Sequence, residues 1–565
     1  MPTPAAEPTP RPGSTYRPPP PDRPASTRVA DPATTGARRT AAGVAAEPPG
    51  RFVPDSSRTI GGRRTAAAVA ASTVSGTSPH APNLVIDPDP SWHLARRAAH
   101  AATADTAAAV AKMGTAKWLD AQLKPSAIDD SACERHVAAA FPLAGMSAPQ
   151  VRSATGNKPW NAPPAVARAT VWRQLTTRRP LLESVVEMWH DHLHVALFSD
   201  KIHEHVGAYD REVIRKHAFG TFKDLLAAAT LHPAMLLYLD NAGSTKANPN
   251  ENLGRELLEL HTVGVGAHTE ADVKAAARLL TGLSVDWSTG AFVYRPGDHA
   301  TGPVTCVGLT LANRSTDRSK VLADVRRLTD HLATRPAAVR RIVGRMARRF
   351  VADEPPASLL DRLASAYLAG GTAIAPVLRA LFTSQEFAGS VGAKWRRPQE
   401  LMATLVASGR PTYVAPTEAG EWAKLGTYTW LLETLGHVPL DHPDPDGPSD
   451  LASSWRHPGA LLARWNAAEG VAGRWDKTLA MAPWRDVFGI TTSLTYAQAA
   501  DRIVHQLCGI HPSPADRDTL ARFFARPTGG PDTPAPTAQV SEDAIRWHLD
   551  QTVRLAMASP YLGIR

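Results

Sequence analysis

The stretch that most constrains the fold of this chain reads NENLGRELLELHTVGV and spans residues 250–265. On a helix of about 100° per residue, Leu253, Leu257 and Leu260 fall on one face at spacings of four and three. We expect that face to pack in the core, and we expect Gly264 to end the helix.

Ionisable residues are concentrated on the same helix. Glu251, Arg255 and Glu259 lie four apart on the opposite side, which predicts a surface ladder of ion pairs worth about 0.2–0.5 kcal/mol each. Glu256 and His261 flank the apolar face instead. They project about 140° from one another, so a metal bound by both would need ligands from other segments.

Comparable helical patterns recur along the chain after residue 90, and strands do not alternate with helices. Thr269 is an expected N-cap for the helix after the central one. Residues 281–310 alternate apolar and turn-forming residues, which predicts a small hairpin. The sequence therefore predicts a mainly α fold: a multi-helix globular domain with a small β-hairpin excursion. Its loops are expected near residues 141–165, 284–312, 410–420, 438–452 and 526–540.

Residues 1–85 are rich in Pro, Ala, Thr, Ser and Arg, with few large apolar side chains. We expect a disordered tail there and one helical domain over residues 86–565. Arg63 and Arg64 precede a mildly apolar stretch, as in a twin-arginine export signal; a flexible linker is the alternative. The protein is expected in the periplasm, cell wall or medium if the signal is used, and in the cytoplasm otherwise. No apolar run approaches the roughly 20 residues that cross a bilayer.

The net charge argues against a nucleic-acid partner. The chain carries 62 Lys and Arg against 53 Asp and Glu, a net of +9. Residues 1–85 contain ten Arg and five acidic residues, so the remaining 480 positions share only +4. The three cysteines form no C-x-x-C pair and allow at most one disulfide within the chain. Motifs for a nucleophile elbow, a phosphate loop, an H-E-x-x-H zinc site and a dinucleotide fold are absent.

A histidine-rich segment ends the helix expected over residues 166–195, and it reads ESVVEMWHDHLHV. Glu187 and His190 form the Glu-x-x-His unit that di-iron bundles use, but only one copy is present. His190 and His192 are candidate metal ligands, because histidine is the commonest protein ligand for transition metals. The alternative is a set of histidines that hydrogen-bond across helix interfaces.

Several stretches together resemble the bacterial domain-of-unknown-function family 1800. They are NENLGRELLELHTVGV with HTEADVKAAARLLTGL, WHLARRAAHAATADTAAAV, MWHDHLHV, YDREVIRKHAFGTFKDLLAAATLHPAMLLYLDN, RRIVGRMARRFVADEP, FTSQEF, KWRRPQEL and ASPYLGIR. The resemblance covers roughly residues 90–565. It implies a helical, often exported domain without an established activity, and a companion protein encoded nearby as partner. This chain departs from the family pattern at Ala300, Val304 and His437, where the family has Asp, Lys and Gln.

Two hypotheses about function remain open. In the first, an exported enzyme or metalloprotein gathers His190, His192, Glu256 and His261 around a divalent or transition metal, with Arg255 orienting a carboxylate. Glu256, His192 and Arg255 are then the candidate catalytic residues. In the second, a non-catalytic helical scaffold binds a partner, and the same side chains pair in buried helix–helix hydrogen bonds.

Overall fold

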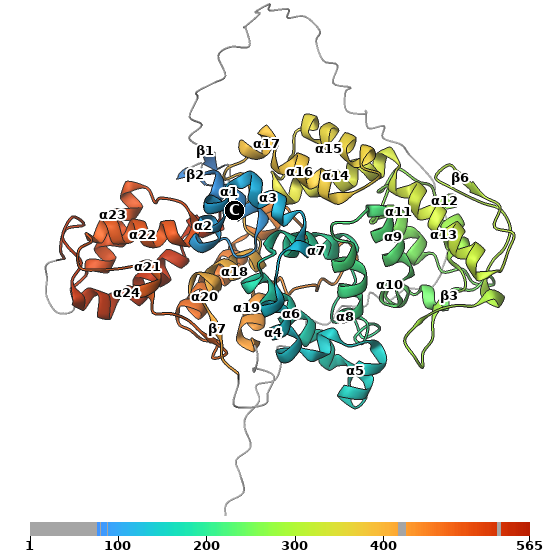
Figure 1. The fold of residues 1–565 in the computed structure, drawn as a ribbon, viewed down its shortest axis with the longest axis horizontal. Helices are drawn as coiled ribbons and strands as arrows, with labels where there is room; N and C mark the ends of the chain where they lie inside the picture. Colours follow the sequence, from blue (N-terminus) through green and yellow to red (C-terminus); the bar gives the residue numbers. More distant parts are fainter. Residues whose placement is uncertain (1–75, 79–80, 87–88, 416–424, 528–532) are drawn as a thin grey trace, which may run out of the picture. The chain divides into compact units, whose positions relative to one another are not determined.

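The computed structural model describes residues 76–78, 81–86, 89–415, 425–527 and 533–565. Most of the predicted tail, including Arg63 and Arg64, lies outside the described residues. Strands β1 (Gly76–Ser78) and β2 (Ala81–Ile86) form an antiparallel pair inside the segment that was predicted as tail. The described residues belong to one compact unit, shown in Figure 1.

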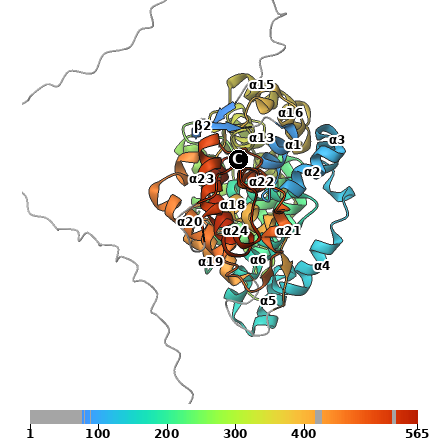
Figure 2. The ribbon, with the colours of Figure 1, turned by 90° about the vertical axis from the view of Figure 1, so that its left-hand side faces the viewer.

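Helices dominate the described chain, which confirms the predicted fold class (Figures 1 and 2). The helices of the first half are α1 (Pro90–Ala98), α2 (Ala104–Met113), α3 (Thr115–Gln122), α4 (Ser131–Ala140), α5 (Ala148–Thr155), α6 (Ala162–Thr176), α7 (Pro180–His192), α8 (Val206–Ala208), the π-helix η4 (Tyr209–Arg215), α9 (Phe222–Leu231), α10 (Pro233–Tyr238), α11 (Asn252–Glu259) and α12 (Glu270–Leu280).

The helices of the second half are α13 (Arg318–Ala333), α14 (Pro336–Phe350), α15 (Ala357–Ala369), α16 (Ile374–Phe382), α17 (Gln385–Ala388), α18 (Pro398–Ser408), α19 (Gly426–Thr434), α20 (Pro458–Ala472), α21 (Trp484–Phe488), α22 (Tyr496–Cys508), α23 (Pro514–Ala525) and α24 (Glu542–Met557). The 3-10 turns are η1 (Pro125–Ala127), η2 (Pro142–Gly145), η3 (Pro159–Asn161), η5 (Asn241–Gly243), η6 (Pro296–Asp298), η7 (Ala452–Trp455) and η8 (Pro560–Gly563).

The remaining strands form small antiparallel pairs. They are β3 (Leu283–Val285) with β4 (Phe292–Tyr294), β5 (Val304–Cys306) with β6 (Leu309–Leu311), and β7 (Thr412–Tyr413) with β8 (Leu479–Ala480). The first two pairs are hairpins that follow α12, where the sequence predicted one. The third joins segments far apart in the chain.

The central helix packs closely on its successor. Leu253 and Leu257 of α11 are fully buried, as predicted, whereas Leu260 is half-buried because the helix already ends at Glu259. A Cβ at Gly254 would lie 3.0 Å from the backbone nitrogen of Ala277, so glycine permits the close approach of α11 to α12.

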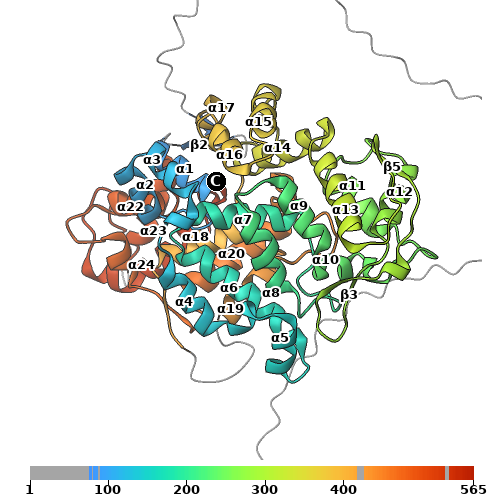
Figure 3. The same cartoon turned by 45° about the vertical axis from the view of Figure 1, so that its right-hand side comes forward.

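The histidine-rich segment differs from the prediction in its helix boundaries. A single helix was expected through residue 195, but α6 ends at Thr176 and α7 ends at His192. Pro180 is the first residue of α7. The missing N–H of a proline costs no helical hydrogen bond at this position, whereas further inside a helix it would. His194 therefore lies in the extended segment after the helix. Helices α6, α7 and α18 lie side by side in Figures 1 and 3.

Within the described residues, no helix combines the length and apolarity needed to cross a membrane. The cysteines Cys133, Cys306 and Cys508 are buried and free.

Candidate functional site

Two segments meet where α7 ends. The backbone nitrogen of Leu197 donates to the carbonyl of Leu440 at 3.0 Å. The His194 Nε2 lies 3.0 Å from the carbonyl oxygen of His442, and its Nδ1 lies 3.3 Å from the carbonyl oxygen of His190. Burial lowers the pKa of His194 to about 4, so the ring carries one proton, and the shorter contact assigns it to Nε2. The extended segment after α7 therefore holds the backbone that leads into the loop His-Pro-Asp-Pro-Asp-Gly at residues 442–447.

This loop is stiff and fixed against the helix. Pro443 and Pro445 each restrict their own φ, and Gly447 has a φ of +69°, which favours glycine. A Cβ at Gly447 would lie 2.2 Å from the carbonyl oxygen of Asp191, so the loop backbone presses on the last turn of α7. No larger residue fits there without displacing the loop.

The loop gathers three metal-ligating side chains. One ligand atom from each of His442, Asp444 and Asp446 lies within 4.8 Å of the other two. The His442 Nε2 and the Asp446 Oδ1 are 3.7 Å apart, within the span of about 4.2 Å that two metal–ligand bonds of about 2.1 Å allow. These side chains are partly exposed, so an ion can reach them from solvent.

Glu256 of α11 lies in the electrostatic field of this loop. Burial and the charge of Glu259 raise the pKa of the Glu256 carboxyl, Arg255 opposes the rise, and Asp446 adds to it. Tyr238 of α10 lies in the same field. Burial raises the pKa of Tyr238 to about 12, and the charges of Asp444 and Glu256 contribute to the rise. Negative charge is thus concentrated here, which favours a cation.

The other predicted ligands are placed elsewhere. The His190 Nε2 lies 2.8 Å from the Asp210 Oδ1, and the His192 Nε2 donates to the carbonyl of His261 at 3.0 Å. His261 is buried, its Nε2 has no hydrogen-bond partner among the described residues, and burial lowers its pKa to about 3.

Over the described ranges, His190, His192, Glu256 and His261 do not form a group of three ligand atoms within 4.8 Å. Helix geometry explains the separation of the first two, because residues two apart project about 200° from one another.

Arg255 forms the predicted surface ladder. Its guanidinium pairs with Glu251 at 3.1 Å and Glu259 at 3.5 Å, which confirms the ladder, and it also binds both carboxylate oxygens of Glu270 at 2.7 and 2.8 Å. These partners occupy the guanidinium. The structure gives Arg255 no hydrogen bond to Glu256, the carboxylate that it was proposed to orient.

A largely buried ion network lies behind the loop. Arg397 donates to Asp191 at 2.7 Å and to Asp450 at 3.2 Å, and Arg349 pairs with Glu187 and, at 3.0 Å, with Glu400. Ion pairs and hydrogen bonds connect five acidic and five basic side chains, so their formal charges cancel: Glu187, Asp191, Asp353, Glu400 and Asp450 with Arg345, Arg349, Lys394, Arg397 and Arg565.

This network keeps its carboxylates charged by pairing. Burial alone would raise the pKa of the Glu187 carboxyl. Arg349 and Arg397 nevertheless hold this pKa well below its usual range. Asp191 differs, because burial raises its pKa in spite of Arg397. Buried charges need such partners, so the network supports the loop from behind and is not open to ligands.

The structure shows the contacts of the three residues that depart from the family pattern. His437 lies in the network, where Arg397 donates to its Nε2 at 2.8 Å. Ala300 donates its backbone N–H to the Thr281 hydroxyl at 2.8 Å, and Val304 is buried at the start of β5.

A second group with metal-ligand spacing, Asp130, Cys133 and Glu134, is already occupied by protein partners. Asp130 accepts from the Thr177 hydroxyl at 2.6 Å, and Arg173 binds both oxygens of Glu134. Burial raises the pKa of the Cys133 thiol to about 12, which disfavours the thiolate that binds metals. We therefore take the loop as the candidate site.

The family described as protein of unknown function (DUF1800) matches residues 93–562. The chain belongs to the DUF1800 family. No curated protein and no solved structure matches it. The family has no established function, so the function of this DUF1800 protein is inferred from its own residues.

The sequence predicted only a loop over residues 438–452 and no site residues within it. A signal was present: His442, Asp444 and Asp446 alternate with prolines, and alternate residues of an extended segment face the same side.

Proposed function

We propose that this DUF1800 protein binds a divalent metal ion through His442, Asp444 and Asp446, with the charge of Glu256 adding to the negative field around the loop. The convergence of three ligand atoms within 4.8 Å on a stiff loop is the observation that carries the proposal. None of the predicted ligands His190, His192, Glu256 and His261 belongs to this group of ligand atoms.

The donor set suits borderline metals. One imidazole and two carboxylates match Zn²⁺, Mn²⁺ or Fe²⁺, whereas a site for a soft ion would need thiolates. The partial exposure of the side chains leaves coordination positions for water or a small ligand, as in catalytic metal sites. We therefore infer a metal-dependent ligand-binding function.

We also propose that the protein is exported. The support is the twin-arginine pair at Arg63 and Arg64, which precedes a mildly apolar stretch as in a twin-arginine export signal. Cell fractionation of the wild type and of the Arg63→Lys, Arg64→Lys double variant tests this, since lysines should abolish twin-arginine export. Equal amounts outside the cytoplasm would refute it.

Metal analysis tests the proposed site. Untagged protein is loaded with Zn²⁺ or Mn²⁺, desalted and measured by inductively coupled plasma mass spectrometry. We expect close to one ion per chain, loss of the ion in Asp444→Asn with Asp446→Asn, and reduced retention in Glu256→Gln. The control is Asp130→Asn, which alters the occupied cluster. Retention by the double variant would contradict the proposal, and loss in His192→Ala alone would favour the histidine set that the sequence predicted.

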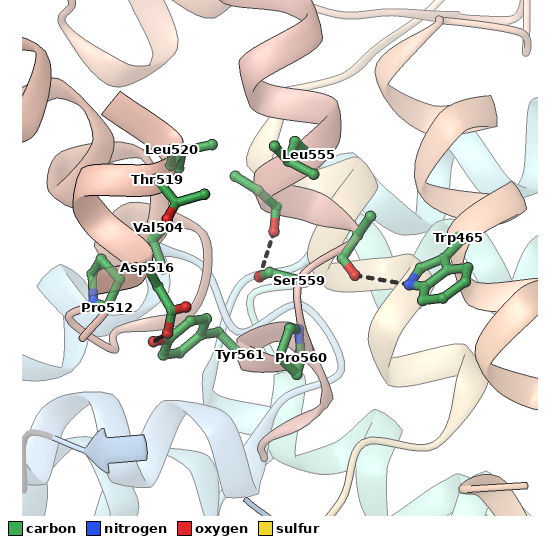
Figure 4. A pocket seen from close by; sticks show the side chains of 12 residues that line it. Trp465, Val504, Pro512, Asp516, Thr519, Leu520, Leu555, Ser559, Pro560 and Tyr561 are labelled. Carbon is green, nitrogen blue, oxygen red and sulfur yellow. Dashed lines mark hydrogen bonds between the residues drawn. The ribbon is translucent and has the colours of Figure 1, made fainter. Parts of the chain in front are cut away.

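The second hypothesis, a scaffold for a companion protein, has one observation in its favour. An apolar hollow of about 420 Å³ lies among α20, α22, α23 and α24 (Figure 4). Trp465 donates to the carbonyl of Ala558, and Tyr561 donates to Asp516, so these polar groups are already paired. A partner would place an apolar side chain there. Co-purification with Leu555→Arg should then lose the partner.

A further inference from the structure

Another hollow, of about 400 Å³, lies between α6 and α19, which are neighbours in Figures 1 and 3. Its charged and aromatic wall residues are Arg168 of α6, Phe198 of the segment after α7, Trp430 and Glu433 of α19, and Asp441. Small-molecule sites usually have volumes of about 300–1,000 Å³. The hollow is therefore large enough to hold a small ligand.

Hydrogen bonds fix two parts of the wall to each other. The N–H of Phe198 donates to the Oδ1 of Asp441 at 3.3 Å, one residue beyond the backbone bond from Leu197 to Leu440. Asp441 directly precedes His442 in the chain, although it is not one of the proposed metal ligands. The wall is thus held in place by the fold itself, as in most small-molecule sites.

Two aromatic side chains of the wall are unusually open to solvent. Phe198 is 43% exposed and Trp430 is 41% exposed. Large aromatic rings are normally much more buried, and apolar surface left open inside a hollow marks a place where a ligand binds. These rings therefore offer the hollow flat apolar surfaces on which a ligand ring can pack.

The charged wall residues have both signs, because Arg168 is positive and Glu433 and Asp441 are negative. Glu433 is exposed, and in the described part of the chain its carboxylate has no ion pair and no hydrogen bond. The Oδ2 of Asp441 likewise accepts no hydrogen bond from a described residue. The hydroxyl of Thr429, also on the wall, already donates to backbone carbonyls at the start of its own helix. The hollow therefore keeps carboxylate oxygens available as acceptors.

These charges restrict the charge of the ligand. A cation would face Arg168 as well as the two carboxylates, and an anion would face the carboxylates as well as Arg168, so neither meets a wall of one opposite sign. A zwitterion would gain little, because ion pairs near solvent contribute only weakly. Uncharged hydroxyl groups avoid both repulsions, and each can donate to a carboxylate or accept from a guanidinium.

We infer that this hollow binds a neutral saccharide. The apolar C–H face of a pyranose ring packs on Trp430 and Phe198. Hydroxyl groups on the rim of the ring donate to Glu433 and Asp441, and another accepts from Arg168. Hydrogen bonds to charged groups are stronger than those between neutral groups, so they can replace the bonds of these hydroxyls with water. The inference does not rest on the proposed metal site.

Isothermal titration calorimetry of the full chain tests the inference, after treatment with a chelator and desalting so that a bound metal plays no part. The probes are neutral disaccharides of glucose, galactose, mannose and N-acetylglucosamine. We expect saturable binding of at least one probe, with one molecule bound per chain. The affinity should not change when the salt concentration is raised tenfold, because salt screens only interactions between charges. Trp430→Ala and Glu433→Ala should each weaken binding about tenfold, since one removes the stacking surface and the other a charged acceptor.

Matched controls come from exposed residues outside the wall. Trp287 is 66% exposed, and Glu354 is an exposed glutamate with no ion pair among the described residues. Trp287→Ala and Glu354→Ala should bind the saccharide as the wild type does. Three results would each overturn the inference: no saturable binding of any probe by the wild type, tighter binding of an amino sugar or a uronic acid than of its neutral parent, or wild-type affinity in Trp430→Ala or Glu433→Ala.

Discussion

The imidazole of His194 donates to the main-chain carbonyl of His442 across 248 positions of sequence, at 3.0 Å. A side chain of the histidine-rich segment therefore orients the proposed metal-binding loop, and it is not one of the proposed ligands. Partners that orient metal ligands are worth about 10–100-fold in metal affinity.

His194→Leu should accordingly weaken the binding of Zn²⁺ or Mn²⁺ about tenfold to a hundredfold, because the His442 backbone loses its hydrogen bond. Competition titration against a chelating dye measures the affinity. His511→Leu, which removes an exposed histidine paired with Asp501, is the control. Unchanged affinity in His194→Leu would show that the loop does not depend on this contact.

Gly447→Ala should displace the loop and reduce metal retention. Its Cβ would meet the Asp191 carbonyl at 2.2 Å, in addition to the strain of a positive φ. Gly436→Ala is a matched control, because Gly436 has a φ of +72° and open space around its Cβ position. Both variants should lose about 1–2 kcal/mol of unfolding free energy from backbone strain, and Gly447→Ala should lose more. Denaturant unfolding and metal content measure the two effects, and equal losses would contradict the clash.

Glu187→Gln should destabilise the fold by about 3–5 kcal/mol, because it leaves Arg349 and Arg397 buried without the charge that they face. Urea unfolding measures the change. Glu386→Gln breaks a comparable pair with Arg362 at the surface, and should cost far less because solvent screens exposed charges. A small effect in both variants would mean that the network contributes little to stability.

Acid should weaken the fold through buried neutral histidines. Burial lowers the pKa of His261 to about 3, whereas in the unfolded chain histidine titrates near 6.5. This stability is complete above about pH 6.5 and decreases as the pH falls towards the folded value. By pH 4.5 the contribution of His261 falls by on the order of 2 kcal/mol.

Unfolding midpoints at pH 7.5, 5.5 and 4.5 measure this dependence. His261→Gln should flatten it, because glutamine does not titrate in this range. A variant with the same slope as the wild type would exclude His261 as a source.

The sequence predicted the features that depend on local rules. The apolar spacing of Leu253 and Leu257 placed their face in the core, and the N-cap at Thr269 is present with its capping box. The Glu251–Arg255 pair of the ladder also follows from a spacing of four residues. Each of these depends on neighbours within one or two turns of helix.

The candidate site could not be predicted in the same way, because its contacts connect distant segments. His190 and His192 were singled out by type, yet their partners are Asp210 and the carbonyl of His261. The influence of the Asp446 charge on Glu256 depends on how the fold arranges α11 and a loop almost two hundred positions later. The residue spacing within one segment cannot predict which distant segment lies beside it.

The cancelling charges of the buried network also limit how this protein can change over generations. Losing any one of its members leaves an opposite charge without compensation in the interior, so isolated substitutions are penalised. A variant lineage must replace an acid and its base together, or move through an unstable intermediate. Ion pairs therefore couple sequence changes in segments that are far apart in the chain, namely α7, α14, α18 and Arg565.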